Sequence, residues 1–310
     1  MADLFAPETK ASAAVNTARA LVPQLVRSAL QKRDTSRSGQ ITLSPQTRSN
    51  TDPLLDSFAI RTFRDMADGD YIMARSAYKN RLVPQFLTAS HQAIEKYIKC
   101  ILLIHRIKSR NIGHSLARGL QKMSEIKSFE VNLSKRSRDF IGYLDRHEKI
   151  RYFEYSYYVF GPALIDLDRT VWEVRQYCHR LDYSLRTLDG REIPMLQKEL
   201  ARIAQFQRNP HKYRLQGGSL EKIIDDSANP ARKTLIWKNA FFGDRTKRNL
   251  KLLCLSYSGN SPLYLHPEIL PEISEYVFIP PEVKKIYEKY LILSKKKEPS
   301  EGRELPEIKR

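Results

Sequence analysis

Cysteine is scarce in this sequence of 310 residues, and its three cysteines lie far apart. They are Cys100, Cys178 and Cys254, and no two of them form a CxxC pair. Disulfide frameworks and zinc sites both depend on recurring cysteine spacings, so the sequence predicts neither. We expect a fold without disulfides, metal or other cofactor, in a reducing compartment such as the cytoplasm.

Long apolar runs are also missing. The longest candidate, Ile101–Ile104, is far shorter than the roughly 20 residues that a membrane-spanning helix needs. The first residues include Asp3 and Glu8 and lack the basic stretch followed by an apolar run that marks a secretory signal. Phosphate loops, dinucleotide fingerprints and Gly-x-Ser-x-Gly elbows are absent as well. The sequence therefore predicts no contact with a membrane and none of these common catalytic classes.

Acidic residues are outnumbered by basic ones. The chain has 53 Lys and Arg against 35 Asp and Glu, which gives a formal net charge of +18. A charge of this sign attracts polyanions and raises their encounter rate. Neutralisation of phosphates alone supplies non-specific affinity for nucleic acid. We therefore expect RNA or another single-stranded nucleic acid as the partner, with an acidic protein surface as the alternative.

Apolar residues recur mostly at steps of three and four, which predicts a mainly α-helical protein. One predicted core stripe consists of Tyr78, Leu82, Phe86, Ala93 and Tyr97. The main predicted helices cover residues 54–67, 70–103, 162–185 and 281–293. Asp68-Gly69-Asp70 is predicted to end the first of them, and Pro84 to break the second near Val83. Cys178 lies on the apolar stripe of the third.

Composition divides the chain into four predicted parts. Residues 1–53 read as an amphipathic helical arm followed by a polar linker, and residues 54–185 as a helical bundle. Residues 186–294 read as a C-terminal extension of mixed but mostly helical elements that packs on the bundle. Residues 295–310 read as a charged tail.

Several features carry a resemblance to a known family. They are Ala77-Tyr78 and Leu82, the run HQAIEKYIK at His91–Lys99, the sequence GHSL at Gly113–Leu116, and RYF at Arg151–Phe153. The stretch from about residue 70 to 185 resembles the HEPN domain, the higher-eukaryote and prokaryote nucleotide-binding family. Many members have Arg-Tyr-Pro where this chain has Arg-Tyr-Phe. The resemblance implies a bundle of four or five helices that often forms a homodimer.

Catalytic members of that family place an Arg and a His on one helix with four to six residues between them. Two such pairs meet across the dimer and cleave RNA without metal. In that chemistry a His moves the 2′-hydroxyl proton and an Arg stabilises the phosphate charge. No Arg precedes a His at that spacing in this chain, and the nearest pairs have three residues between them.

The two nearest pairs are Arg175 with His179, and Arg110 with His114. Arg175 and His179 are the first catalytic hypothesis, because a spacing of four places both side chains on one face of a helix. A solvated or interface pair is the alternative. Arg110 and His114 are the second hypothesis, with a helix-start role for His114 as the alternative. Arg151 is a further candidate phosphate ligand.

Two basic stretches are candidate nucleic-acid-binding sites. The second lies close to Trp237, Phe241 and Phe242, and aromatic rings beside basic groups suit the stacking of unpaired bases. The alternative is a buried aromatic patch flanked by solvated charge. The first stretch contains Arg106, Lys108, Arg110, Arg118, Lys122 and Lys127, and the second contains Arg245, Lys247, Arg248 and Lys251.

These observations favour a basic HEPN-like protein that binds RNA or a nucleotide without strong catalysis. The missing Arg–His spacing argues against catalysis, and the positive charge argues for nucleic acid. One alternative is a metal-independent endoribonuclease of the toxin or defence type that acts as a dimer. The other is a non-catalytic dimerising adaptor for a protein partner.

Overall fold

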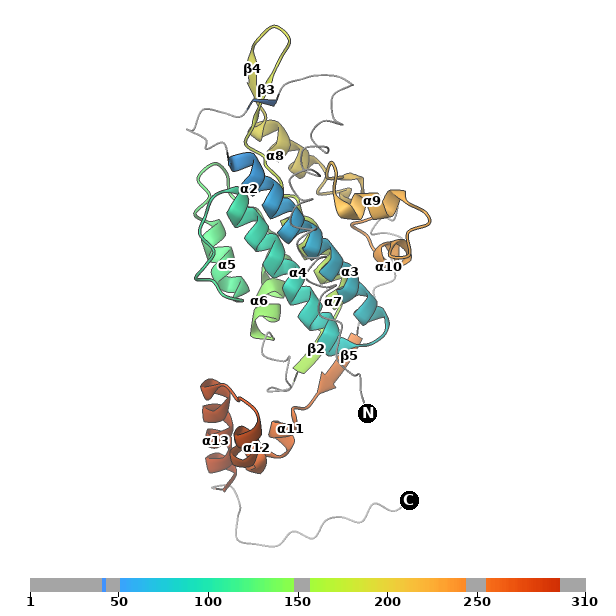
Figure 1. Ribbon diagram of the computed structural model, residues 1–310. Coiled ribbons are helices and arrows are strands. Elements are labelled where there is room, and N and C mark those ends of the chain that lie inside the picture. Colours follow the sequence, from blue (N-terminus) through green and yellow to red (C-terminus); the bar gives the residue numbers. More distant parts are fainter. Residues whose placement is uncertain (1–40, 43–50, 148–156, 244–254, 296–310) are drawn as a thin grey trace, which may run out of the picture. The chain divides into compact units, whose positions relative to one another are not determined.

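The computed structural model describes residues 41–42, 51–147, 157–243 and 255–295 (Figure 1). Helices dominate these residues, which confirms the mainly α-helical prediction. Internal contacts divide the chain into two units, one containing residues 1–42 and 184–193 and the other containing the rest. Most of the predicted arm and linker at residues 1–53 lies outside the described residues, as does nearly all of the tail.

The smaller unit contributes a three-stranded sheet. Its strands are β1 (Ile41–Thr42), β3 (Ser184–Arg186) and β4 (Glu192–Pro194), in the order β1-β3-β4. β1 and β3 are antiparallel, with Ile41 opposite Leu185.

In the larger unit, one continuous helical stretch begins at Asp52. It consists of α2 (Asp52–Phe58), the π-helical turn η1 (Ala59–Arg64) and α3 (Asp65–Lys79). The prediction that Asp68-Gly69-Asp70 ends a helix was therefore wrong. Asp68 is 1% exposed inside α3, and its carboxylate is bonded to side chains from other helices. Those tertiary bonds outweigh the weak helix propensity of the tripeptide.

α3 packs against α4 (Val83–Ile104) along most of its length (Figure 1). The break predicted near Val83 is confirmed, because α3 ends at Lys79 and α4 begins at Val83. Arg81 turns the chain with a φ of 61°, and Pro84 occupies the first turn of α4, where a missing N–H breaks no helical bond.

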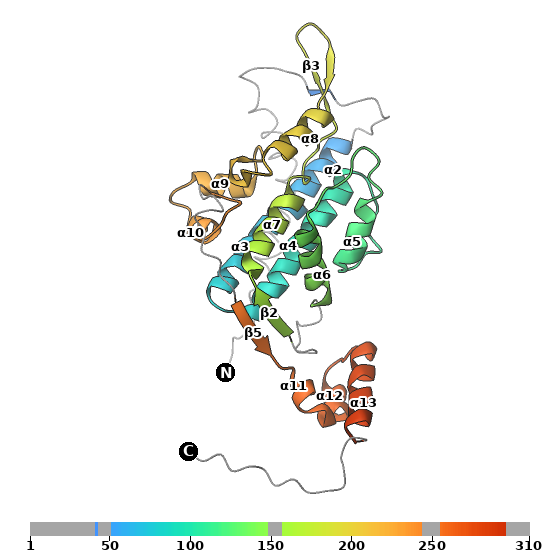
Figure 2. The ribbon, with the colours of Figure 1, turned by 180° about the vertical axis from the view of Figure 1, so that it is seen from behind.

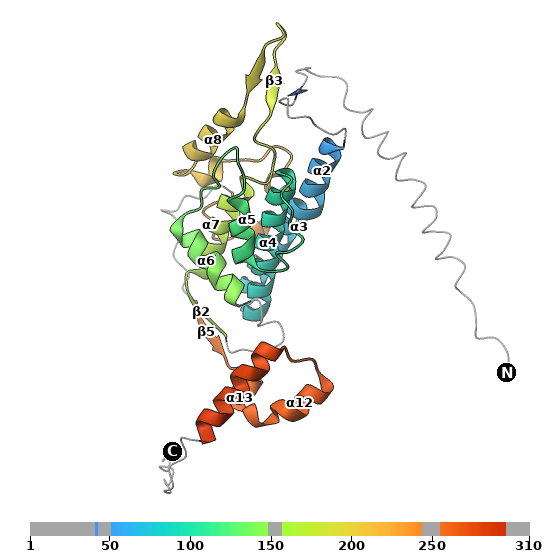
Figure 3. The same cartoon turned by 90° about the vertical axis from the view of Figure 1, so that its left-hand side faces the viewer.

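The remaining bundle helices are α5 (Leu116–Met123), α6 (Lys135–Arg146) and α7 (Ala163–Arg175). Serine N-caps start α5 and α6: the Ser115 hydroxyl accepts a bond from the Arg118 N–H, and that of Ser134 from the Ser137 N–H. Figure 2 shows α7 against α4, and Figure 3 shows α5 and α6 on the same side of the bundle.

The helix predicted for residues 162–185 is shorter than expected. α7 ends at Arg175, and turns follow it. Cys178 and Leu181 are nevertheless fully buried, so the apolar spacing correctly indicated burial but not a helix.

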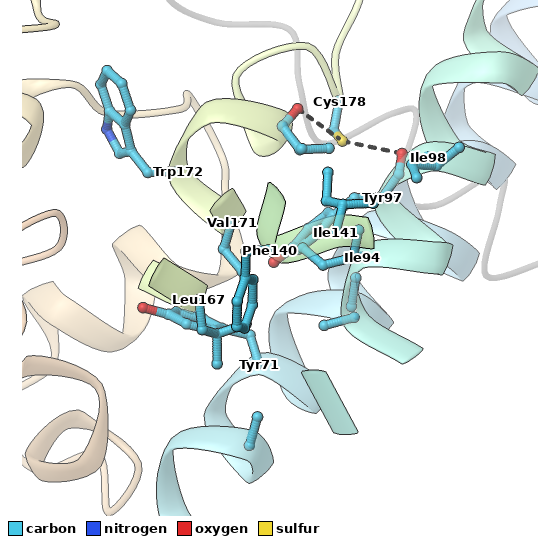
Figure 4. Packing of buried hydrophobic residues seen from close by; sticks show 14 of the residues in the cluster. Tyr71, Ile94, Tyr97, Ile98, Phe140, Ile141, Leu167, Val171, Trp172 and Cys178 are labelled. Atoms are coloured by element: carbon cyan, nitrogen blue, oxygen red, sulfur yellow. Dashed lines mark hydrogen bonds between the residues drawn. The ribbon is translucent and has the colours of Figure 1, made fainter. Parts of the chain in front are cut away.

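The core lies where α3, α4, α6 and α7 meet, as Figure 4 shows with Tyr71, Tyr97, Ile141 and Val171. Four residues of the predicted stripe, Tyr78, Phe86, Ala93 and Tyr97, are buried, which confirms that part of the prediction. Leu82 is 52% exposed, so its inclusion was wrong. It lies in the turn before α4, where the helical periodicity does not apply.

After α7, short elements pack on the bundle or form their own cluster. β2 and β5 pair antiparallel, with Val159 opposite Tyr257. The last helices bury a small core of their own around Val283 and Tyr287. No helix among the described residues has the length and apolar character needed to cross a membrane. The elements are β2 (Tyr157–Gly161), α8 (Leu196–Gln205), η3 (Pro210–Lys212), α9 (Ser219–Asp225), α10 (Arg232–Ile236), β5 (Leu255–Gly259), α11 (Pro262–Leu265), η5 (Pro267–Ile269), α12 (Leu270–Tyr276) and α13 (Pro281–Lys295).

Candidate functional site

Arg175, the first catalytic candidate, is 2% exposed and lies between two carboxylates. Its Nε and Nη2 donate to Asp68 on α3 at 2.8 and 2.9 Å, and its Nη1 and Nη2 donate to Glu221 on α9 at 2.8 and 2.7 Å. The Tyr97 hydroxyl adds a 2.6 Å bond to Asp68. Burial alone would lower the Arg175 pKa, but the charges of Asp68 and Glu221 raise it. This guanidinium joins three helices and has few donors left for a phosphate.

Gly218 provides the space for this ion pair. A Cβ built at Gly218 would overlap the Glu221 carboxylate and lie 2.7 Å from Arg175 Nη2. The φ of Gly218 is −70°, which any residue adopts, so glycine is needed here for its small size.

A second buried network surrounds Arg75, which is 0% exposed on α3. Arg75 pairs with Asp168 on α7 and also donates to the Thr234 and Trp237 carbonyls after the bundle. The Asn239 side-chain amide donates through Nδ2 to the Tyr71 hydroxyl at 2.9 Å, and its Oδ1 accepts from the N–H groups of Phe241 and Phe242. Arg75 and Asn239 therefore tie α10 and the residues after it to the bundle.

His179, the predicted partner of Arg175, lies in the turns after α7 rather than on the helix. The argument that the two side chains share a helix face therefore fails. The His179 Nε2 is 3.5 Å from the Tyr213 hydroxyl, and burial lowers the His179 pKa to about 4. The catalytic role of this pair stays a prediction. Arg175 is buried and burial lowers the His179 pKa, so the alternative of a solvated pair does not hold.

The low pKa of His179 predicts acid sensitivity. His105 behaves alike, since burial lowers its pKa to about 4 as well. An unfolded His has a pKa near 6.5, so the unfolded chain takes up protons first as the pH falls. The free energy of unfolding should keep its full value above about pH 6.5. It should fall toward pH 4, by roughly 1.4 kcal/mol per pH unit for each His.

The check is urea unfolding at several pH values for the unmodified protein and for His179→Gln. The variant should show a shallower fall of unfolding free energy between about pH 6.5 and 4.5. Identical slopes would show that His179 contributes nothing to the acid sensitivity.

The second catalytic candidate, Arg110 with His114, is accessible to solvent. His114 is 59% exposed at its side chain, and its Nδ1 lies 3.2 Å from both oxygens of Glu95 on α4. Glu95 also accepts a 2.5 Å bond from Lys99. Burial would raise the Glu95 pKa, but bonds from Lys99 and His114 lower it, so the carboxylate stays ionised. An ionised carboxylate that holds one imidazole nitrogen orients the other for proton transfer.

Around His114 lies the first basic stretch, residues 105–127, which we call the basic segment. It contains six cationic residues and one acidic residue, Glu125. Lys108, Arg110, Arg118 and Lys127 are exposed, and in the described part of the chain none of them pairs with a carboxylate. Lys122 pairs with Glu125 at 2.7 Å.

Within this segment, Arg106 is bonded to acidic side chains of α2 and to the end of α4. Its guanidinium pairs with Asp52 and Asp56 on α2 and donates to the Leu103 carbonyl at the end of α4. The backbone of Arg106 is left-handed, with a φ of 58°. Arg106 therefore caps α4 and attaches α2 to it, which leaves its charge largely neutralised.

The second basic stretch, with Arg245, Lys247, Arg248 and Lys251, lies outside the described residues, as does Arg151. Of the aromatic residues beside it, Phe241 and Phe242 are 2% and 5% exposed and belong to the core. Trp237 is half-buried, with the Nζ atoms of Lys79 and Lys238 at 5.7 and 5.6 Å from its ring centroid.

Sequence reasoning missed the partners of these groups. Asp68 was interpreted as part of a helix end, and Glu221 was not singled out. Both lie far along the chain from Arg175, by 107 and 46 residues, and no local pattern links them. The signal for Glu95 was present, since Glu95 and Lys99 occupy the i and i+4 positions that allow pairing on a helix.

Comparison with known proteins gives one match. Residues 60–180 match the family model described as the HEPN domain. No curated protein and no solved structure matches this chain. HEPN domains are associated with nucleotide or RNA binding, or with RNase activity. The matched residues contain the basic segment, the Glu95–His114 pair and α7. The match confirms the resemblance that the sequence motifs indicated, over residues 60–180 of this chain.

Proposed function

We propose that this protein binds single-stranded RNA through the basic segment and does not cleave it with Arg175 and His179. The observation that carries the proposal is a set of four exposed cations that have no carboxylate partner among the described residues, and all four lie within the match to the HEPN model: Lys108, Arg110, Arg118 and Lys127. Cations without carboxylate partners are free to replace the counterions of RNA phosphates. The formal net charge of +18 adds long-range attraction.

The environment of Arg175 supports binding over catalysis. A catalytic Arg must reach the phosphate that it stabilises. Here the guanidinium is buried and bonded to Asp68 and Glu221, so reaching a phosphate would require breaking two buried ion pairs. Loss of such pairs is strongly destabilising, which makes this residue a structural element of the bundle.

Removing the exposed cations should weaken RNA binding and its salt dependence together. In a variant with Lys108, Arg110 and Arg118 replaced by alanine, the slope of log affinity against log salt should fall by about 2, because each phosphate contact on a single strand contributes about 0.7. Filter binding of a labelled single-stranded RNA between about 50 and 200 mM salt measures both quantities.

The matched control replaces Lys198, Arg208 and Lys212, three exposed cations outside the HEPN domain, with alanine. This control variant loses the same net charge. Its slope of log affinity against log salt should change by less than the ~0.7 that one phosphate contact contributes. Equal effects of the two triple variants would show that net charge rather than this segment binds RNA. Full retention of affinity by the first variant would refute the site.

The second candidate function is a metal-independent endoribonuclease, and the Glu95–His114 pair is the observation in its favour. The His114 Nε2 would move the 2′-hydroxyl proton, and Arg110 would supply positive charge for the phosphate. A cleavage assay in chelator with His114→Ala tests this function. His266→Ala is the control, because His266 forms a similar exposed pair with Glu268 at 3.1 Å. Cleavage that persists undiminished in His114→Ala excludes the assignment.

We also propose that the protein forms a homodimer through the helical stretch α2–η1–α3. Apolar side chains remain exposed along it, with Leu55 at 37%, Phe58 at 52%, Met66 at 56% and Met73 at 64%. HEPN domains often act as dimers, which supports a second copy as the partner that would cover this surface. Figure 3 shows α2 and α3 along one side of the bundle.

Introducing charge on this surface should separate the two copies. Met66→Glu with Met73→Glu is expected to weaken self-association at least tenfold, about 1.4 kcal/mol, because each carboxylate would have to be buried without a partner. Sedimentation velocity over a concentration series measures the effect. Leu188→Glu, at a fully exposed position of the smaller unit, is the control and should leave association unchanged. A monomeric unmodified protein would exclude the dimer.

A further inference from the structure

A pocket of about 600 Å³ lies at one edge of α5, between the loop 124–134 and the start of α6. Pockets of about 300–1,000 Å³ are the usual size for small-molecule groups. Its wall is mainly apolar, and its polar lining residues are Ser124, Lys127, Glu130 and Arg138. The apolar lining consists of Leu120, Met123, Ile126, Phe129, Val131 and Leu133.

The loop that forms this pocket is held in place from α7 and the residues just after it. The Asn132 N–H donates to the Tyr177 hydroxyl at 3.2 Å, and the Ser134 N–H donates to Glu173 at 2.8 Å. The Phe129 ring stacks on Tyr177, with centroids 5.7 Å apart and an interplanar angle of 15°. Little ordering of the loop would be needed on binding, which favours affinity.

The charges at the pocket select an anionic ligand. Lys127 and Arg138 both line it and are exposed, and within the described residues neither pairs with a carboxylate. Glu130 is the single acidic lining residue. Lys127 is also the last cation of the basic segment, so the pocket adjoins the surface to which we assign phosphate binding.

We propose that this pocket receives an unpaired base of single-stranded RNA, with the adjoining phosphates bound by Lys127 and Arg138. The inference rests on the proposed function and specifies its substrate class. A base is apolar on its faces and can contact the aromatic ring of Phe129, while its phosphates need the cations. Bases inside a duplex are stacked and paired, so they would have to be extruded before they could enter.

The test uses a short single-stranded RNA that contains 2-aminopurine and a blunt duplex of the same sequence. Binding is followed by fluorescence, and exposure of the base by acrylamide quenching. We expect at least tenfold tighter binding of the single strand, a difference that one buried, stacked base can supply. Quenching should fall when the single strand binds.

Two variants test whether the single-strand preference and the protection from quenching arise at the pocket. Ser124→Trp fills the pocket from an exposed position and should abolish both the protection from quenching and the single-strand preference. Arg138→Ala should weaken single-strand binding more than Lys135→Ala does. Lys135 is on the same helix and 87% exposed but does not line the pocket, so its removal controls for the lost charge. Unchanged melting temperatures show that the variants fold.

The outcomes separate this inference from the proposed function. Equal binding of single strand and duplex, with no effect of Ser124→Trp, would overturn the pocket assignment while leaving RNA binding by the basic segment in place. Tight single-strand binding without protection of 2-aminopurine would overturn it as well. Absence of any RNA binding would overturn both, and a protein side chain would then be the better occupant of the apolar pocket.

Discussion

Replacing Asp68 with alanine is expected to lower the free energy of unfolding by about 3–5 kcal/mol, because removing one partner of a buried ion pair leaves the other charge uncompensated. Asp68 accepts two bonds from Arg175 and one from Tyr97, and it is 1% exposed. The variant leaves the Tyr97 hydroxyl and part of the Arg175 guanidinium without their acceptor in the core. Urea unfolding monitored by circular dichroism measures the loss.

Asp139→Ala is the matched control for this prediction. Asp139 also pairs with a cation, Lys135, but the side chains of the pair are 62% and 87% exposed. An exposed pair of this kind contributes at most about 0.5 kcal/mol. If Asp68→Ala cost no more than Asp139→Ala, the buried network would not be the structural element described here. Arg175 would then be available for another role.

Replacing Phe86 with alanine should be comparably costly, at about 3–5 kcal/mol. Phe86 is 0% exposed on α4, and its ring packs edge-on against Tyr78 of α3 with centroids 5.1 Å apart. Truncation removes an aromatic ring from the main helix–helix contact and leaves a cavity that helices fixed on both sides cannot close. The midpoint of urea unfolding should fall accordingly.

Leu82→Ala provides the comparison within the same predicted stripe. Leu82 is 52% exposed in the turn before α4, so its truncation should change the unfolding free energy by less than about 1 kcal/mol. Sequence periodicity alone assigns both residues to the core and predicts similar costs. A large effect of Leu82→Ala would indicate that a partner or a second copy covers this turn.

Much of the helical bundle could be predicted from local signals. Apolar residues at steps of three and four in residues 83–104 predicted the helix α4, and Pro84 predicted where it begins. Local signals failed where tertiary bonds decide the structure. Asp68 and Gly69 resemble a helix end, yet the Arg175 guanidinium, 107 residues away, and the Tyr97 hydroxyl hold Asp68 inside α3. Cys178 is buried as its spacing indicates, but from a turn after α7.

The candidate site was predictable in its charge and not in its geometry. The density of Lys and Arg in residues 105–127 is visible in the sequence, and exposure of Lys108, Arg110, Arg118 and Lys127 follows from the cost of burying unpaired charge. The neutralisation of Arg106 by Asp52 and Asp56 depends on how α2 packs against α4. The pocket depends on the loop 124–134, which Tyr177 and Glu173 fix from a distant part of the chain.

The central claim is that this HEPN domain binds RNA and leaves it intact. The most direct measurement is a filter-binding titration of the unmodified protein with end-labelled single-stranded RNA at about 50 mM salt, followed by denaturing gel analysis of the bound RNA. We predict saturable retention, loss of retention as salt rises, and recovery of full-length RNA. Absence of retention at that salt, or shortened RNA whose production requires His179 or His114 in folded variants, would contradict the account.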